Sequence, residues 1–423
     1  MLEFEVLKVR RTEANESHWM LGTKLFKEFF ASERAGGLIL IGVTICSMII
    51  ANSVIGEQVI HTFHTKILGM SIEHWVNDGL MVIFFLMIGL ELEREIYEGE
   101  LSSIRKAALP VVAAMGGMIL PATIHTLFNY GTPTQSGAGI PMATDIAFSL
   151  GVLSLFGSKV PYSLKVFLAA LAIADDLGAI IAIAVFYTKE LNLMYLGIAA
   201  GILAALFILN RTRMNVLWPY LIAGVAMWYC LLNSGVHATI GGVLLAFVLP
   251  FSRNREECVS HRLQHRLHFP VAFILLPLFA FVNTCIPLQS DWYTTLLEPN
   301  SKGIFLGLVV GKPLGILLFC WLAVKIGLGS LADGLSWSHL VGAGFLAGIG
   351  FTMSIFVSIL AFEDHKLVQM SQVTVLIGSL VSALLGAIWF MSVVPSSSAS
   401  EVDPANQEDV PNLDVAYSPG RSV

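Results

Sequence analysis

The chain has 423 residues, of which 56% are hydrophobic and only 13% are charged. Soluble globular domains carry about 25% charged residues, so the composition excludes an ordinary soluble domain and predicts an integral membrane protein. The formal net charge is −6, with 30 acidic against 24 basic residues, and we expect no nucleic-acid partner for a chain with this balance.

Apolar runs of about twenty residues recur along most of the chain. A helix of that length crosses a hydrocarbon core about 30 Å thick, and the alternating ten-residue strands of an outer-membrane barrel are absent from the sequence. We therefore predict an all-α polytopic membrane protein with twelve transmembrane helices. Their expected ranges are 36–55, 76–92, 108–129, 141–157, 164–187, 194–210, 216–232, 236–251, 269–289, 303–325, 339–361 and 371–394.

The charges outside these ranges predict the orientation of the chain. Most of the 24 Lys and Arg residues fall in segments on the same side as the N-terminus, and such positive segments stay in the cytoplasm. We expect a multi-pass protein of a bacterial inner membrane with both termini cytoplasmic. Three regions follow: a cytoplasmic segment with an amphipathic helix at 1–35, the membrane domain at 36–394 and a disordered acidic tail at 395–423.

Four ionisable side chains lie well inside the apolar ranges. Asp175 and Asp176 are adjacent in the run "LAIADDLGAIIAIAVF", and each carboxylate at a helix centre costs about 2.5 to 3.5 kcal/mol. Successive helical residues point about 100° apart, so the two need different partners. One faces Asp145 in an oxygen-rich cation site, and the other pairs with Lys312. Three aspartates against one lysine leave a negative surplus, which distinguishes an ion-binding site from a buried cluster that only neutralises itself.

Two of the expected spans show signs of interruption at membrane depth. The span 141–157 begins with Pro141 and carries Thr144 and Asp145 only a few residues later. The span 339–361 contains "GAGFLAGIGFTMS", with glycines at Gly342, Gly344, Gly348 and Gly350. Broken spans at corresponding places in two halves are typical of secondary transporters, so we expect spans three to five and ten to twelve to form inverted repeats. Close helix packing is the other explanation of the glycines.

Five motifs resemble those of the bacterial NhaA-type sodium/proton antiporters, across residues 28–392. They are "ATDIAF" (143–148), "LAIADDLGAI" (171–180), "SGVHAT" (234–239), "GKPLGI" (311–316) and "GIGFTMSIF" (348–356). The resemblance implies twelve helices, with the fourth and eleventh broken and crossing at the midplane; this family is itself one of the examples behind the inverted-repeat rule. It also implies that Asp176 is the principal sodium ligand, with Asp145 and Thr144 beside it. Asp175 is expected in the same ligand set and as the partner of Lys312 in proton coupling.

The resemblance further implies an access path and a pH-responsive cluster. Asp78 in "WVNDGLM" is expected to line the path, unless it only caps a helix. The cluster comprises Glu91, Arg94, Glu95, His265 and His268. The run "ELEREIYEGE" also fits a solvated helix end with internal ion pairs. His237 is either a further pH-sensing group or the donor of an interfacial hydrogen bond, and Gly350 marks the break in the eleventh span.

Three features depart from the family pattern. Gln264 stands where a glutamate is familiar and cannot titrate, and Glu93 stands where a lysine is familiar. The first change removes a titratable group from the expected pH sensor, and the second alters the charge of the pH-responsive cluster. The loop 56–74 is shorter than the segment that forms a dimerising hairpin in the best-known relative, so we expect weaker contacts in a homodimer.

Together these features predict an electrogenic antiporter that uses inward proton flow to expel Na⁺ or Li⁺. Protons and the metal ion compete for the buried aspartates, with alternating access and regulation by pH, and no cofactor is expected. The alternatives are another secondary transporter or a cation channel of similar fold, and a membrane-embedded enzyme with an aspartate-rich site. The enzyme is disfavoured because "DDLGA" lacks the third aspartate of a D-D-x-x-D pattern.

Overall fold

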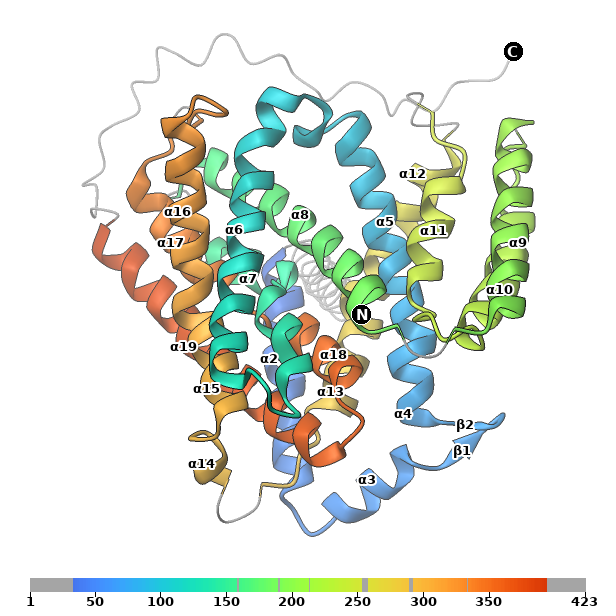
Figure 1. Ribbon diagram of the computed structural model, residues 1–423, viewed down its shortest axis with the longest axis horizontal. Helices are drawn as coiled ribbons and strands as arrows, with labels where there is room; N and C mark the ends of the chain where they lie inside the picture. Colours follow the sequence, from blue (N-terminus) through green and yellow to red (C-terminus); the bar gives the residue numbers. More distant parts are fainter. Residues whose placement is uncertain are drawn as a thin grey trace, which may run out of the picture.

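The computed structural model describes residues 33–157, 160–188, 191–212, 214–252, 258–288, 292–332 and 334–393. The amphipathic helix expected near the N-terminus and the expected acidic tail both lie outside these ranges. Within them the secondary structure is almost entirely helical (Figure 1).

The elements follow one another with short connections. The first half contains α2 (Glu33–Ala51), α3 (Gly56–Phe63), β1 (Lys66–Ile67), β2 (Met70–Ser71), α4 (Ile72–His74), η1 (Trp75–Leu80), α5 (Met81–Tyr97), η2 (Glu100–Ser102), α6 (Ile104–Asn129), η3 (Gln135–Met142), α7 (Ile146–Ser154), α8 (Tyr162–Phe186) and α9 (Leu193–Arg211). The second half contains α10 (Leu217–Leu232), α11 (Ile240–Val248), α12 (Val259–Pro270), η5 (Val271–Leu275), α13 (Leu276–Asn283), α14 (Trp292–Thr295), α15 (Pro299–Leu306), η6 (Gly307–Gly311), α16 (Lys312–Lys325), α17 (Trp337–Ala347), α18 (Phe351–Ala361) and α19 (His365–Val393).

Eight helices in the described ranges are long and apolar enough to cross a membrane, and two bent helix pairs raise that number to ten. The protein is therefore an all-α polytopic membrane protein. The expected range 216–232 agrees with α10, which has 16 residues, whereas the expected range 236–251 contains a shorter helix, α11 with 9 residues. Nine helical residues cover only about 14 Å. The expected eighth span is wrong in its length, because the chain before residue 240 forms turns instead of helix.

Both expected interruptions are present. The fourth span consists of η3, a short extended stretch and α7, and Asp145 is the N-cap of α7 with extended dihedral angles (φ −85°, ψ 103°). The eleventh span stops at Ala347 and resumes at Phe351, with a bend of 48° between α17 and α18. The Asp145 N–H donates to the Ile349 carbonyl at 2.7 Å. Each break thus provides a hydrogen-bond partner for a backbone group of the other break. Backbone polar groups inside a membrane need such partners because no water is present there.

Two π turns lie immediately before prolines in long helices. The turn η5 precedes Pro277, and the turn η6 precedes Pro313. Proline has no N–H, and its ring collides with the carbonyl group four residues earlier. A widened turn accommodates that collision without ending the helix. The second of these turns places Lys312 at the first position of α16.

Tight packing joins α6 to α16 at a pair of glycines. A Cβ on Gly315 would lie 2.1 Å from the Gly116 carbonyl oxygen, and a Cβ on Gly116 would lie 2.3 Å from the Gly315 carbonyl oxygen. Only glycine allows two helix backbones to approach so closely. The helices form a large hydrophobic cluster that includes α8 and α16 to α19, and a smaller one of α9, α10 and α11 with parts of α5 and α12. Figure 1 shows α9 and α10 at one edge of the molecule, away from α7 and α18.

The loop after α3 contains a short antiparallel hairpin of β1 and β2. Its turn is formed by Leu68 and Gly69, whose φ angles are +53° and +89°. Two successive positive φ angles give a two-residue turn whose twist matches the flanking strands. A hairpin therefore forms in the loop 56–74 although this loop is short.

Candidate functional site

Asp175 and Lys312 form a buried ion pair. Both residues are 0% exposed, and Lys312 Nζ lies 2.8 Å from Asp175 Oδ2. The Lys312 ammonium also donates to the Met142 carbonyl oxygen, and Thr144 Oγ1 donates to Asp175 Oδ2 at 2.6 Å. A buried pair is tolerated only when further hydrogen bonds offset the desolvation of both charges. The broken fourth span supplies such a bond to each member of this pair.

Asp145 connects the N-termini of two half-helices. Its Oδ1 accepts a hydrogen bond from the Phe148 N–H at 3.0 Å, in the first turn of α7. Its Oδ2 accepts from the Thr352 N–H at 3.1 Å and from Thr352 Oγ1 at 2.5 Å. Gly350 is the N-cap of α18, so Thr352 lies in the first turn of that helix. A helix N-terminus carries about half a positive charge, so two of them stabilise the Asp145 carboxylate without a basic side chain.

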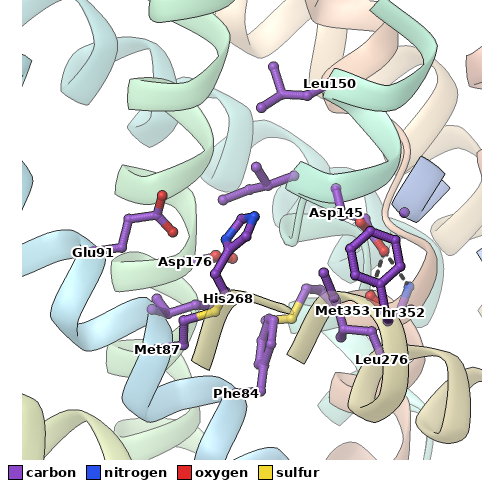
Figure 2. A pocket seen from close by; sticks show the side chains of 16 residues that line it. Phe84, Met87, Glu91, Asp145, Leu150, Asp176, His268, Leu276, Thr352 and Met353 are labelled. Carbon is purple, nitrogen blue, oxygen red and sulfur yellow. Dashed lines mark hydrogen bonds between the residues drawn. The ribbon is translucent and has the colours of Figure 1, made fainter. Parts of the chain in front are cut away.

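Asp176 lacks comparable support. It is 1% exposed, and its Oδ1 has no hydrogen-bond partner within the described ranges. Asp176 lines a cavity of about 210 Å³ together with Asp145 and Thr352. Figure 2 shows Asp176 apart from Asp145, and its dashed lines mark the hydrogen bonds that Asp145 accepts from Thr352. Much of the remaining wall is apolar and includes Phe84, Met87, Ile88, Leu150, Phe273, Leu276 and Met353. An apolar wall strengthens the attraction between a carboxylate and a cation.

The structure separates the expected ligand set into two groups. Asp176 and Asp145 line the cavity, whereas Thr144 and Asp175 do not. Thr144 instead lies beside Asp175, with its hydroxyl also 3.0 Å from the Ala347 carbonyl oxygen. The sequence interpretation missed Thr352. Its signal was a hydroxyl residue two positions after the glycine at the break, in "GIGFTMS".

The proposed pH-responsive cluster is partly assembled beside the same cavity. Arg94 Nη2 lies 3.7 Å from Glu91 Oε1 and 3.4 Å from Glu95 Oε1. Glu91 and His268 line the cavity with Asp176, and all three side chains are labelled in Figure 2. His265 is exposed and does not line the cavity. The structure therefore places four members of the cluster at or beside the cavity and leaves His265 at the surface.

The run "ELEREIYEGE" is only partly a solvated helix end. Arg94 and Glu95 form the expected internal ion pairs and are half-buried. Glu93 differs, because it is 3% exposed and accepts a hydrogen bond from Ser260 Oγ at 2.9 Å. The solvated interpretation is wrong for Glu93, whose buried carboxyl group connects α5 with α12.

Asp78 and His237 line a second cavity, of about 420 Å³, near the N-terminal end of α5. Asp78 lies in the π turn η1, with its Oδ2 3.0 Å from His74 Nε2. It does not cap a helix, because Ser71 is the N-cap of α4 and accepts from the His74 N–H at 3.1 Å. His237 Nε2 lies 2.9 Å from the Tyr187 carbonyl oxygen. The interpretation of His237 as a hydrogen-bond donor thus has a specific acceptor, the Tyr187 carbonyl oxygen.

Comparison with known proteins gives matches that extend over most of the chain and include the five motifs. The family model described as "Na+/H+ antiporter 1" matches residues 27–390. The chain belongs to this antiporter family. The Na(+)/H(+) antiporter NhaA of Cytophaga hutchinsonii is 57% identical over 380 residues, which cover 90% of this chain and 98% of that relative. The Na(+)/H(+) antiporter NhaA 1 of Flavobacterium johnsoniae is 56% identical over 375 residues, with coverages of 89% and 98%. The Na(+)/H(+) antiporter NhaA of Dechloromonas aromatica is 56% identical over 371 residues, with coverages of 87% and 95%.

Membership in the antiporter family confirms the resemblance inferred from the five motifs. Members of this family are transporters, so the membrane-embedded enzyme is excluded. The matched range includes both broken spans, the buried ion pair and every residue that lines the cavity.

Proposed function

We propose that this protein is an electrogenic antiporter that expels Na⁺ or Li⁺ from a bacterial cell in exchange for inward-moving protons. The names of the family and of the relatives support sodium and protons as the transported ions. Asp176 and Asp145 bind either the metal ion or protons. Each ion therefore displaces the other, because a carboxylate that holds a proton no longer attracts a cation.

The observation that carries this proposal is the uneven charge balance around the cavity. Asp175 is paired with Lys312, and Asp145 is held by two helix N-termini. Asp176 lines the cavity, and its Oδ1 has no partner in the described part of the chain. A buried carboxylate in that position must bind a proton or a cation, and carboxylate and hydroxyl oxygens suit a hard cation. The exchangeable charge is therefore assigned to Asp176.

The Asp175–Lys312 pair couples cation binding to proton movement. Asp175 and Asp176 are neighbours in α8, so a cation beside Asp176 changes the electrostatic environment of the whole pair. The three groups then titrate as one unit, and the released protons belong to the unit rather than to one residue. Exchange of unequal numbers of protons and metal ions makes transport electrogenic.

The broken spans supply the basis for alternating access. We assign spans three to five and ten to twelve, of twelve transmembrane helices in total, to two inverted repeats. Their first helices, α6 and α16, pack at the glycine pair, and their two breaks are hydrogen-bonded to each other. Rocking of this core exposes the site to each side in turn. With both termini cytoplasmic, the cavity with Glu91 and His268 faces the cytoplasm, and the one with Asp78 and His237 faces the opposite side.

Regulation and assembly follow from the remaining residues. We assign the pH response to Glu91, Arg94, Glu95, His265 and His268, with His237 as a separate group on the other side of the membrane. The hairpin of β1 and β2 is the proposed contact of a homodimer, because Leu68 at its turn is 88% exposed.

Everted membrane vesicles test the exchange itself. A pH-sensitive dye quenched by respiration is expected to dequench on addition of NaCl or LiCl, and less on addition of KCl. Asp176→Asn should abolish the sodium response, because an amide cannot exchange a proton for a cation. Asp364→Asn is the matched control, since Asp364 is exposed and its side chain accepts a hydrogen bond from the nearby Lys366 N–H. Full sodium-dependent proton movement in Asp176→Asn would refute the site.

A second measurement separates an antiporter from a cation channel of similar fold. In proteoliposomes without a pH gradient, an antiporter moves protons in response to a sodium gradient, and the rate saturates with NaCl and depends on voltage. A sodium current without proton movement would identify a channel instead.

A further inference from the structure

The cavity of about 420 Å³ near the N-terminal end of α5 is rich in titratable side chains. The chain has 11 histidines, and the cavity is lined by four of them: His64, His74, His237 and His365. Three carboxylates complete the titratable lining, those of Glu73, Asp78 and Glu363. Histidine is the side chain that changes its charge between about pH 5 and pH 8, so this cavity exchanges protons with water in that range.

Two imidazole–carboxylate pairs lie in the cavity. His64 Nδ1 is 3.4 Å from Glu73 Oε2, and His74 Nε2 is 3.0 Å from Asp78 Oδ2. The histidine side chains are 55% and 52% exposed, and their carboxylate partners are 30% and 18% exposed. The His365 ring lies nearly perpendicular to the His64 ring, with 6.3 Å between the centroids. The imidazoles therefore meet the water first, and the carboxylates lie deeper.

The nearby residues of fixed positive charge lie outside this lining. Lys66 and Lys366 are exposed and do not line the cavity, and neither does exposed Asp364, which accepts from the Lys366 N–H. With its imidazoles neutral, the described lining thus carries only negative charge. A concave surface of one charge sign concentrates ions of the opposite sign and raises their rate of arrival about tenfold or more.

The supply of protons limits exchange in an alkaline medium. At pH 8 the free proton concentration is about 10⁻⁸ M, and capture at a diffusion limit of about 10⁹ to 10¹⁰ M⁻¹ s⁻¹ brings about 10 to 100 protons per second to one site. Turnover numbers of proteins reach about 10³ s⁻¹. A single acceptor would therefore hold back a fast antiporter, whereas several acceptors around one mouth collect protons over a larger area.

We propose that His64, His74 and His365 form a proton-collecting group that supplies the transport path when the external medium is alkaline. This inference deepens the proposed function and rests on it, because the proposed orientation makes this cavity the entry for inward-moving protons. The three imidazoles are separate from the proposed pH-responsive cluster, which lies at the other cavity.

His74 passes the collected proton to Asp78. In the neutral ring, Nε2–H donates to Asp78 Oδ2, so Nδ1 is the basic nitrogen. Nδ1 takes a proton from a hydronium ion or a buffer acid and leaves water or the conjugate base. The imidazolium then gives its Nε2 proton to the Asp78 carboxylate and becomes neutral. The proton has thereby moved from an exposed ring to a less exposed carboxyl group.

The test varies the supply of protons outside right-side-out vesicles. Vesicles loaded with NaCl and diluted into sodium-free medium take up protons, and an entrapped dye reports the rate. At external pH 8 in about 0.5 mM HEPES, the variant His64→Gln/His74→Gln/His365→Gln should exchange about fivefold more slowly than wild type. About 50 mM HEPES should restore its rate to within about twofold, because the buffer acid then delivers the protons. At pH 6, where free protons are about a hundredfold more abundant, the two rates should agree within about twofold.

Two controls locate the effect. His61→Gln is the matched control and should behave as wild type in both buffers, because exposed His61 lies in the same α3 segment and does not line the cavity. Everted vesicles place the external buffer at the cytoplasmic face. With little buffer inside them, added HEPES should leave the variant slow.

The inference is overturned if the triple variant equals wild type at pH 8 in about 0.5 mM HEPES. A variant that is equally slow in both buffers would also overturn it, since a structural defect does not respond to a mobile proton donor. His74→Gln alone tests the same point if the triple variant fails to accumulate in the membrane, with a defect of about twofold that the buffer removes. Each of these results leaves the proposed function standing, whereas absence of exchange in the wild type would refute that function itself.

Discussion

Replacing Lys312 with methionine removes the cation of the buried pair and keeps a side chain of similar length. In the wild type both Asp175 and Lys312 are 0% exposed and 2.8 Å apart. In the variant, the described contacts leave Asp175 with the Thr144 hydroxyl as its hydrogen-bond donor. The folded variant must then either keep an uncompensated buried charge or take up a proton.

The free-energy cost of protonating Asp175 sets an upper limit on the stability that Lys312→Met loses. An aspartate side chain in water has a pKa of about 3.9, so protonating it at pH 7 costs about 4 kcal/mol. Removing one partner of a buried pair typically costs about 3 to 5 kcal/mol, which agrees with that limit. We therefore expect Lys312→Met to lose about 4 kcal/mol of unfolding free energy at pH 7.

The pH dependence distinguishes this explanation from a general packing defect. The folded variant holds a proton on Asp175 that the unfolded chain releases above about pH 4, so its stability falls by about 1.4 kcal/mol for each pH unit as the pH rises. The deficit relative to wild type should shrink to about 1.5 kcal/mol at pH 5. Asp175→Asn should behave in the opposite way. It leaves Lys312 charged beside the Met142 carbonyl without its carboxylate partner. The loss of stability relative to wild type should therefore become smaller as the pH rises, because the lysine then releases its proton more readily.

Thermal or denaturant unfolding of the purified variants in detergent, at pH 5 to 9, measures both trends. Lys325→Met is the matched control, because exposed Lys325 lies at the end of the same helix, 4.6 Å above the Trp321 ring. It should lose less than about 1 kcal/mol at every pH. The double variant Lys312→Met with Asp175→Asn should show neither trend. A deficit of Lys312→Met that does not change with pH would refute the reasoning, since no proton would then replace the lysine.

Two further predictions concern packing and the phenol of Tyr187. Gly315→Ala should destabilise the protein by about 1 to 3 kcal/mol, because the added Cβ would lie 2.1 Å from the Gly116 carbonyl oxygen. Gly197→Ala is the control, because a Cβ at that position would have nothing within 4 Å. Equal Tm values for the two variants would contradict the prediction. Tyr187 donates to the Ser136 carbonyl at 2.8 Å, and burial raises the pKa of Tyr187 to about 12, compared with about 10 in an unfolded chain. Its contribution is therefore complete below pH 10, and about 3 kcal/mol is lost between pH 10 and pH 12. Tyr187→Phe should lack that loss in unfolding experiments from pH 8 to 11.5, and a wild-type loss of equal size in the variant would assign it to other groups.

Much of the fold could be predicted from local properties of the sequence. Pro141 and the glycines up to Gly350 indicated the two interruptions, because both residue types have a low intrinsic preference for the helix interior. The prediction was weakest at 236–251, where an apolar composition suggested a full span and the structure has nine helical residues. Hydrophobicity does not show where turns replace helix, so the length of α11 could not be obtained from composition.

At the site, the sequence indicated which residues are unusual but left their partners open. Asp175 and Asp176 are equivalent in sequence terms, and the structure pairs Asp175 with Lys312 while Asp176 lines the cavity. Thr352 was overlooked because a threonine in an apolar helix is common. Glu93 was expected in a solvated run and is buried against Ser260, because α12 covers that face of α5.

The sequence by itself determined that this is a polytopic membrane protein of the sodium/proton antiporter family with an excess of acidic groups in its interior. Helix length, hydrophobicity and charge count are properties of short segments, so they can be read without a fold. Only the tertiary structure decided which carboxylate pairs with a lysine, which accepts hydrogen bonds at two helix N-termini, and which has neither kind of partner in the described part of the chain. Those pairings join residues far apart in the chain, such as Asp145 and Thr352 at a separation of 207 positions. They depend on how the two broken spans cross.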